Sequence, residues 1–462
     1  MGVSRRNVLR LAGAAVAAGG ALETRPARWA RLRARLAGEL LVPGDAAYEA
    51  ARLPFNSLFD HHRPAAIARC ARVEDVQHCL EEARRSGIAV AARGGGHSYA
   101  AYSTPHEGLV VDLAPMAGVE VRPDGTAVVG AGARLGDVYA ALAAAGRCLP
   151  LGNCPSVGIA GFTLGGGLGW LQRTYGLACD WLRSARVVTV DGRVVTASAE
   201  CEPELFWALR GGGGGNFGVV TSFEFATAPV PAALTVFRVR YPAGSAADVL
   251  GAWQPWSAAL PEAVSSTCVA APDGSVDLVG CAVGPEAVLL GEVGRLLRQV
   301  DGPLEHGEVD HPTATAIMTA GHPSRNAFRA SSRIADRLWD DPTPVVDALR
   351  GKDSALLIVG ALGGAIDRVG PNGTAYPHRG APTSVEVFGT VGSLPPGQVT
   401  REVDDVQSAL AGLIGTGTYI NYLDPEQEDW AATSYRHNLR RLRAVARRYD
   451  PDRVLRFPQA VR

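Results

Sequence analysis

The chain has 462 residues, of which 47% are apolar and 20% charged, and its formal net charge is −1. This length is enough for two or three domains, each with its own core. The near-neutral charge argues against nucleic acid as the main partner. Because no apolar run reaches the length of a membrane-spanning helix, we expect no stable insertion into a membrane.

The N-terminus reads "SRRNVLRLAGAAVAAGGAL", with Arg5 and Arg6 followed by a mildly apolar stretch. This pattern predicts a twin-arginine export signal over residues 1–22 and a place outside the cell or in its envelope. That route carries proteins that are already folded. The alternative is a basic N-terminal helix without a targeting function.

The first half mixes helices and strands without a regular strand–helix–strand rhythm, which is typical of the α+β class. The predicted helices cover 74–86, ended by Gly87, and 135–146. The predicted strands cover 88–92, 109–113, 127–133 and 217–225, with a hairpin over 186–197 that turns at Asp191 and Gly192.

Pro229 and Pro231 indicate a domain boundary. From about 233 to 425, strand-like runs alternate with helical ones, which predicts a second α+β domain with an antiparallel sheet. The tail "SYRHNLRRLRAVARRYDPDRVL" is predicted to be helical, with its arginines on the solvated face.

Several common cofactor and catalytic motifs are excluded. The GxGxxG at Gly213–Gly218 precedes a predicted strand instead of following one, so a dinucleotide fold of the Rossmann type is not expected. The chain has neither GxxxxGK[ST] nor GxSxG. The histidine and cysteine spacings do not indicate a metal site.

The stretch "ARGGGHSYAAYS" places three glycines directly before His97. A glycine run lets backbone N–H groups approach a ligand closely, and phosphate is a common one. A second loop, 155–161, follows Cys154, so the two loops are suited to cradle one diphosphate. From the residues alone, His97 can be a ligand, a base, a covalent anchor or a buried polar residue.

Six segments together resemble the berberine-bridge-enzyme-like, FAD-linked oxidases of the vanillyl-alcohol-oxidase fold. These segments are "ARLPFNSLFDHHRPAAIARCARVEDV", "RGGGHSYAAYS", "GNCPSVGIAGFTLGGGLGWLQRTYGLACD", "LFWALRGGGGGNFGVVTSFEF", "YINYLD" and "YRHNLRRLRAVARRYDPDRVLRF". The resemblance implies an α+β protein with a two-part PCMH-type FAD-binding domain and a substrate domain whose antiparallel sheet is covered by helices. The implied limits are 37–230 for the FAD-binding domain, 231–425 for the substrate domain, and 426–462 for a C-terminal segment that returns to the FAD-binding domain.

The resemblance also implies the cofactor contacts. His97 matches the family's attachment to the flavin 8α-methyl group and Cys154 the 6-S-cysteinyl position, so we expect a bicovalent FAD. The other matching cofactor positions are Arg93, Gly94, Gly95, Gly96, Ser98, Pro155, Ser156, Val157, Gly158, Ile159, Gly161, Gly218, Val219 and Tyr422.

Three residues match the family's substrate side. Tyr422 and Tyr175 are candidates for proton removal or for packing, and the choice between them stays open. Glu386 matches an acidic or amide position that points into the substrate cavity, with a solvent-facing strand glutamate as the alternative. The sequence does not define the oligomeric state.

The implied reaction transfers hydride from a CH–OH carbon of a sugar, a glycosylated polyketide or an aromatic alcohol to flavin N5. Dioxygen then reoxidises the flavin and forms hydrogen peroxide. Val157 matches a position where valine admits dioxygen in the family, so we expect an oxidase. The alternatives are a dehydrogenase with another acceptor and a flavin-binding protein without turnover.

Overall fold

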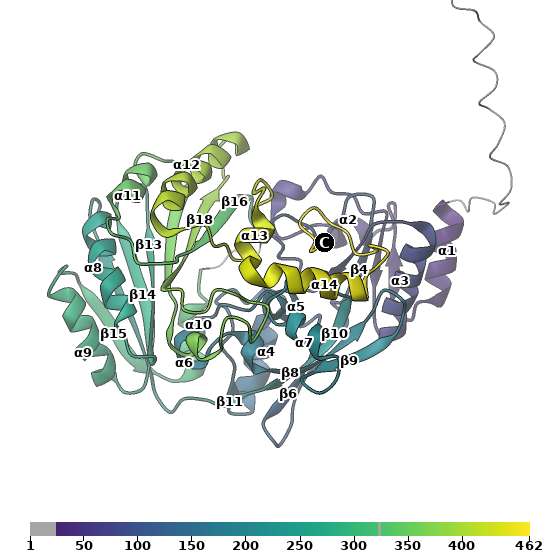
Figure 1. The fold of residues 1–462 in the computed structure, drawn as a ribbon, viewed down its shortest axis with the longest axis horizontal. Coiled ribbons are helices and arrows are strands. Elements are labelled where there is room, and N and C mark those ends of the chain that lie inside the picture. Colours follow the sequence, from purple (N-terminus) through teal and green to yellow (C-terminus); the bar gives the residue numbers. More distant parts are fainter. Residues whose placement is uncertain (1–24, 322–324) are drawn as a thin grey trace, which may run out of the picture.

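The structure is a computed structural model that describes residues 25–321 and 325–462, so Arg5 and Arg6 lie outside the described residues. The N-terminal half lies beside a part built on one large sheet, and the last helix of the chain lies against the N-terminal half (Figure 1). The mixture of helices with largely antiparallel sheets confirms the predicted α+β class. Among the described residues, no helix combines the length and apolarity needed to cross a bilayer.

The first sheet contains the strand that directly precedes the first glycine loop. Its strands, in spatial order, are β1 (Glu39–Leu41), β2 (Ala66–Arg69), β4 (Leu109–Asp112) and β3 (Val90–Arg93), with β2, β4 and β3 parallel. The helices of this half are α1 (Arg25–Arg35), α2 (Tyr48–Ala51), α3 (Val73–Ser86), α4 (Leu135–Ala144), α5 (Ile159–Leu164), α6 (Gln172–Tyr175) and α7 (Pro203–Leu209), with short 3₁₀ turns η1 (Ser57–Phe59) and η2 (Ala178–Trp181). As predicted, α3 ends at Gly87, which takes the left-handed conformation with φ of 68°.

The second sheet is antiparallel and contains the predicted hairpin. Its spatial order is β5 (Val119–Val121), β6 (Thr126–Gly130), β10 (Val219–Ala226), β8 (Leu182–Val188) and β9 (Val194–Ser198), and a separate pair joins β7 (Arg147–Cys148) to β11 (Ala228–Pro229). The chain turns from β8 to β9 at Gly192, whose φ of +87° favours glycine.

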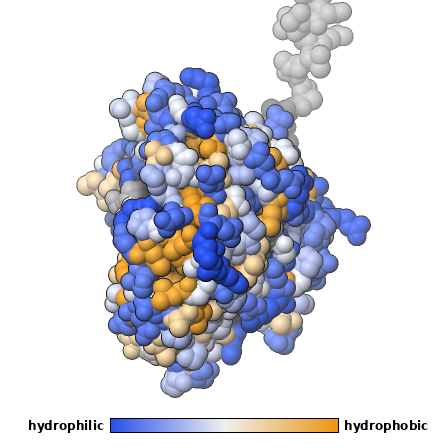
Figure 2. Space-filling view, turned by 90° about the vertical axis from the view of Figure 1, so that its left-hand side faces the viewer, coloured by the Kyte–Doolittle hydropathy of each residue, from blue (hydrophilic) through white to orange (hydrophobic). Residues whose placement is uncertain are grey.

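A seven-stranded antiparallel sheet organises the second half, in agreement with the predicted antiparallel sheet. Its spatial order is β15 (Leu304–Val309), β12 (Leu234–Tyr241), β14 (Val276–Val283), β13 (Val264–Ala270), β17 (Ala355–Ala361), β18 (Thr383–Thr390) and β16 (Phe328–Ile334). The helices of this half are α8 (Ala246–Ala258), α9 (Glu286–Leu297), α10 (His311–Met318), α11 (Thr343–Leu349) and α12 (Pro396–Ile414), with the 3₁₀ turn η3 (Gly364–Arg368). Of these, α8, α9, α11 and α12 cover one face of the sheet (Figure 1). Figure 2 shows this outer side, where an apolar area is bordered by hydrophilic residues.

The alternation of side chains along β18 directs one glutamate away from these helices. Val385 and Val387 are buried in the core cluster that contains Trp253 of α8. Because successive side chains of a strand point to opposite faces, Glu386 and Phe388 face the other way, toward the half that carries the glycine loops.

The C-terminal tail returns to the first half, but as three pieces rather than the single helical stretch that the sequence predicts. They are α13 (Trp430–Tyr435), the 3₁₀ turn η4 (Arg436–Asn438) and α14 (Leu439–Tyr449). The break lies at Arg436, whose φ is 46°. Leu442 and Tyr449 of α14 join the core of the first half. The Val461 N–H donates to Asn216 Oδ1 at 2.9 Å and fixes the end of the chain there.

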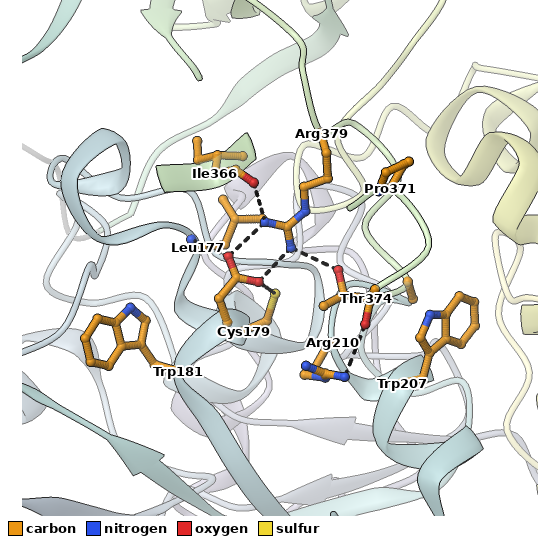
Figure 3. Close-up of polar contacts among 12 residues, drawn as sticks. Leu177, Cys179, Trp181, Trp207, Arg210, Ile366, Pro371, Thr374 and Arg379 are labelled. Atoms are coloured by element: carbon orange, nitrogen blue, oxygen red, sulfur yellow. Dashed lines mark hydrogen bonds and ion pairs between the residues drawn. The ribbon is translucent and has the colours of Figure 1, made fainter. Parts of the chain in front are cut away.

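A buried ion pair joins the two halves (Figure 3). The Arg379 guanidinium donates to both carboxylate oxygens of Asp180 in η2, at 2.7 and 2.8 Å. It also donates to the Ile366 carbonyl at 3.0 Å and to the Thr374 hydroxyl at 2.9 Å. Because a buried charge is costly unless paired and hydrogen-bonded, this arrangement holds segment 364–381 in one position against the first half.

Candidate active site

The two glycine loops predicted to bind a diphosphate contact each other directly. A Cβ atom on Gly95 would lie 2.2 Å from the Gly158 nitrogen, and one on Gly158 would lie 2.2 Å from the Gly95 nitrogen. A side chain at either position would therefore separate the loops. Gly96 has a φ of +71°, which suits glycine and turns the chain into His97.

This contact brings His97 and Cys154 to one hydroxyl group. The Ser156 Oγ lies 2.9 Å from His97 Nε2 and 3.4 Å from Cys154 Sγ. The ring of Phe55 stacks on the His97 imidazole with centroids 3.7 Å apart and planes inclined by 20°. The imidazole is therefore held by an aromatic ring on one face and by a hydroxyl at one nitrogen.

The surroundings of the loops fit a large polar cofactor. The Arg93 side chain pairs with Asp112 at 2.9 Å, yet its buried Nη1 has no hydrogen-bond partner among the described residues. The buried Thr163 Oγ1 also has no hydrogen-bond partner among the described residues. Beside Gly161, a Cβ atom would meet nothing within 4 Å. Unpaired buried donors beside open backbone suit the phosphate and ring atoms of FAD.

Other predicted cofactor residues shape the two loops. The turn after Cys154 closes with the Val157 N–H donating to the Cys154 carbonyl at 3.2 Å, and it carries Pro155 at its second position. Ser98 Oγ accepts a hydrogen bond from the Tyr102 N–H at 3.1 Å. The remaining predicted residues of the two loops are Gly94, whose Cβ would lie 3.0 Å from the Ala131 carbonyl oxygen, and Ile159, which is fully buried.

Gly218 and Val219 lie at the start of β10, inside the second sheet. A Cβ atom on Gly218 would lie 2.7 Å from Val187 and 2.8 Å from the Val188 carbonyl oxygen. The Val219 side chain is fully buried. Close packing against β8 is thus a sufficient reason for this glycine.

Glu386 lies at the centre of an aromatic group beside the loops. The Tyr99 hydroxyl donates to Glu386 Oε1 at 2.9 Å. The Tyr422 ring stacks on the Tyr99 ring, with centroids 5.5 Å apart and planes inclined by 10°. Glu386 is only 8% exposed, which excludes the solvent-facing alternative.

Burial sets the protonation of these groups. It raises the pKa of Glu386 to about 7, although the hydrogen bond from Tyr99 opposes the shift. Burial first, and the Glu386 charge second, raise the pKa of Tyr99 and of Tyr422 well above 10. The Cys154 thiol is close enough to contribute to both shifts. Glu386 thus titrates near neutral pH, whereas both phenols stay protonated.

The loop that carries Tyr422 is fixed to the glycine-rich stretch 165–169. The Tyr419 hydroxyl accepts hydrogen bonds from the N–H groups of Gly167 and Leu168, at 3.0 and 3.1 Å. The Asn421 amide donates to the Phe162 carbonyl at 3.0 Å. A Cβ atom on Gly165 would lie 2.1 Å from Asn421 Oδ1, so a glycine is needed there.

Tyr175 contacts other residues than this group does, and its predicted place on the substrate side stays a prediction. Its phenol lies beside Cys148 of β7 and close to Cys281 of β14. Since β13 and β17 separate β14 from β18, and neighbouring strands lie about 4.8 Å apart, β14 is about 14 Å from the strand of Glu386. The short helix α6 ends at Tyr175 and turns this ring toward Trp181, at 6.1 Å between centroids.

Tyr99 and Phe55 were not among the site residues predicted from the sequence. Tyr99 follows His97 by two positions in the same glycine-loop motif, which was the available signal. Its partner Glu386 is 287 residues away in the chain, so only the placement of β18 shows the contact. Phe55 has no comparable local signal.

Comparison with known proteins agrees with this geometry. Residues 64–198 match the family described as FAD binding domain, and residues 418–462 match the family described as berberine and berberine like. An uncharacterized FAD-linked oxidoreductase of Bacillus subtilis, YgaK, is 32% identical over 93% of this chain and 98% of its own length. The chain belongs to the berberine-bridge-enzyme-like FAD-linked oxidoreductases.

Two carbohydrate oxidases are also similar to this oxidoreductase. The xylooligosaccharide oxidase of Thermothelomyces thermophilus is 32% identical over 88% of this chain and 89% of its own. The solved glucooligosaccharide oxidase of Acremonium strictum, which is described with a 6-S-cysteinyl, 8α-N1-histidyl FAD, has a TM-score of 0.86 and 27% identity over 93% of this chain and 98% of its own. The FAD-binding match covers both glycine loops, and the berberine-like match covers Tyr422.

Proposed function

We propose that this oxidoreductase is an oxidase of a sugar hydroxyl, with oligosaccharides as the favoured substrates and dioxygen as the electron acceptor. The observation that carries the proposal is the buried Glu386, with a pKa of about 7, hydrogen-bonded to Tyr99 next to His97 and Cys154. The similarity to xylooligosaccharide and glucooligosaccharide oxidases supports the substrate class.

Glu386 is the group best suited to accept the proton of the substrate hydroxyl. A general base works best when its pKa is near the working pH, which holds for Glu386. A phenol whose pKa lies well above 10 cannot act as a base on its own at neutral pH, but it can pass a proton on. Tyr99 therefore receives the substrate proton while its own moves to Glu386, and Tyr422 holds the hydroxyl beside it.

The cofactor is FAD, held by the two glycine loops and bonded to His97 and Cys154. Held there, FAD would supply the acceptor for the substrate hydride and the route of two electrons to dioxygen, with hydrogen peroxide as the product. Arg93 supplies positive charge for the diphosphate. The domain limits 37–230, 231–425 and 426–462 form part of this proposal.

The test of the proposed function is a hydrogen peroxide assay on the purified protein. The panel consists of oligosaccharides, monosaccharides, aromatic alcohols and glycosylated polyketides. Peroxide formation with oligosaccharides as the best substrates supports the proposal. Flavin bleaching by a substrate without peroxide formation identifies a dehydrogenase, and the absence of any bleaching across the panel contradicts catalysis on these substrates.

Replacement of Tyr422 by phenylalanine is expected to slow flavin reduction about 10- to 100-fold, because one hydrogen bond to the substrate hydroxyl is lost while Glu386 remains. Anaerobic stopped-flow mixing with substrate measures this rate constant. Covalent flavin should be retained. An unchanged reduction rate would assign Tyr422 to packing alone.

Val157→Ile tests the access of dioxygen. Val157 is half-buried beside the turn of Cys154, and packed interiors leave little room for an extra methylene group. Dioxygen is expected to reoxidise the reduced flavin of the variant at least about 10-fold more slowly. Reduction of the flavin by substrate should be nearly unchanged. Mixing of reduced enzyme with aerated buffer measures the oxidative half-reaction. Equal reoxidation rates in both proteins would remove Val157 from this function.

Export by the twin-arginine route is also part of the proposal, since Arg5 and Arg6 precede a weakly apolar stretch. The double variant Arg5→Lys, Arg6→Lys is expected to remain inside the cell. Immunodetection in the cell and culture fractions measures the distribution. Secretion of the double variant at the wild-type level would exclude this route.

A further inference from the structure

Ser156 connects the two residues that are proposed to bond to the flavin. Its Oγ is 2.9 Å from His97 Nε2 and 3.4 Å from Cys154 Sγ, so one hydroxyl serves both side chains. Two independent features hold this arrangement. The turn from Cys154 to Val157 sets Ser156 next to the thiol, and the stacked ring of Phe55 fixes the plane of the imidazole.

A hydroxyl has one proton to donate and two lone pairs to accept with. In one arrangement, the Cys154 S–H donates to Ser156 and the Ser156 O–H donates to His97 Nε2. In the other, the imidazole N–H donates to Ser156 and the Ser156 O–H donates to a Cys154 thiolate. The same positions satisfy both arrangements, and they differ only by the transfer of one proton from sulfur to nitrogen.

We infer that Ser156 is a proton relay that carries the Cys154 proton to His97 and so prepares the thiolate for its bond to the flavin. The inference rests on the proposed bicovalent FAD. The thiolate, not the thiol, is the nucleophile of cysteine chemistry, so its formation controls the rate of attachment. The relay requires only that His97 Nε2 stay free of the flavin bond, which leaves Nδ1 for that bond.

The attachment balances with dioxygen, the acceptor of the proposed function, as the oxidant. A thiol S–H bond and a flavin C–H bond are replaced by one sulfur–carbon bond. The two electrons and two protons released convert one dioxygen to one hydrogen peroxide. Ser156 moves only the thiol proton. Its replacement should therefore slow the formation of the cysteinyl bond and leave the histidyl bond unaffected.

The test compares wild type, Ser156→Ala and Ser156→Thr, each purified with its flavin. Mass spectrometry of flavin-bearing peptides gives the fraction with both bonds and the fraction with the His97 bond only. In Ser156→Ala at pH 7, the cysteinyl bond is expected to form about 100-fold more slowly, the usual size of a lost proton-transfer group. Ser156→Thr keeps a hydroxyl and should form both bonds as wild type does.

Alkaline pH provides the second readout. Incubation of Ser156→Ala in aerated buffer at about pH 9.5, roughly one unit above the usual pKa of a thiol, should restore the cysteinyl bond, because hydroxide then takes the thiol proton without the relay. If the substitution had only damaged the structure, alkaline pH would not restore the cysteinyl bond. If Ser156→Ala is insoluble, His97→Ala removes the acceptor of the same proton and should show the same dependence on pH.

The possible outcomes distinguish the Ser156 relay from the proposed bicovalent FAD. A wild-type protein with both bonds and a Ser156→Ala variant that forms both at the wild-type rate would overturn the relay and leave the proposed function intact. A slow variant that neither threonine nor alkaline pH restores would also overturn the relay. A wild-type protein without the cysteinyl bond would overturn the bicovalent FAD and the relay together.

Discussion

Glu386→Gln is expected to lower the rate constant for flavin reduction by substrate about 1,000- to 10,000-fold, the upper range for loss of a general base. Glutamine preserves the size of the side chain and can still accept the hydrogen bond from Tyr99, but it cannot take up a proton. The effect therefore isolates proton acceptance from packing. Anaerobic stopped-flow mixing, followed by the flavin absorbance, measures the rate constant.

The pH dependence of flavin reduction provides a second test of Glu386 as the proton acceptor. Burial raises the pKa of Glu386 to about 7, so its carboxyl group is protonated below that pH and able to accept a proton above it. Wild-type flavin reduction should accordingly rise as the pH increases through about 7. Glu386→Gln should lose this rise, because the titrating group is gone.

Glu402 on α12 provides a matched control. Its exposed fraction, 6%, is similar to the 8% of Glu386, and it contacts Ser354 instead of the site tyrosines. Glu402→Gln should reduce its flavin at the wild-type rate. A Glu386→Gln variant that reduces its flavin as fast as this control would exclude Glu386 as the proton acceptor.

The second large effect concerns the attachment of the cofactor. The double variant His97→Ala, Cys154→Ala should release all of its flavin on acid denaturation, whereas wild type should stay yellow in the precipitate. Cys154→Ala should keep the histidyl bond, and His97→Ala should keep a cysteinyl bond that forms slowly at pH 7, because the acceptor of the Cys154 proton is gone. Absorbance of the supernatant and mass spectrometry of the pellet measure the released and bound fractions.

The matched control for this pair is Cys148→Ala. Cys148 is a free cysteine whose thiol lies beside Tyr175, outside the group of Glu386 and Tyr99. Its replacement should leave both flavin bonds in place. Flavin that washes out of denatured wild-type protein would contradict covalent attachment altogether.

Local patterns predicted the elements whose causes are local. The apolar spacing over 74–86 and the glycine after it were sufficient for α3, because the helix ends where Gly87 takes a left-handed conformation. The turn at Gly192 was likewise visible in the sequence. Periodicity did not show the break at Arg436, because a left-handed arginine within a helical pattern depends on contacts with the rest of the fold.

In the candidate site, too, features with local causes could be predicted and long-range contacts could not. The glycines before His97, and Cys154 before the second glycine loop, could be recognised from their motifs. The hydrogen bond from Tyr99 to Glu386 could not, because it depends on how β18 faces the first half. For Tyr175, whose place on the substrate side stays a prediction, the motif match carries no information on the direction that the short helix α6 gives its last side chain.

The most direct test of the proposed oxidase is an anaerobic titration of the purified, flavin-bearing protein with an oligosaccharide, followed by admission of air. We expect one substrate molecule to bleach one flavin, and air to restore the colour with formation of one hydrogen peroxide per flavin. A flavin that stays oxidised under excess oligosaccharide, or that bleaches but is not reoxidised by air, would contradict this proposal.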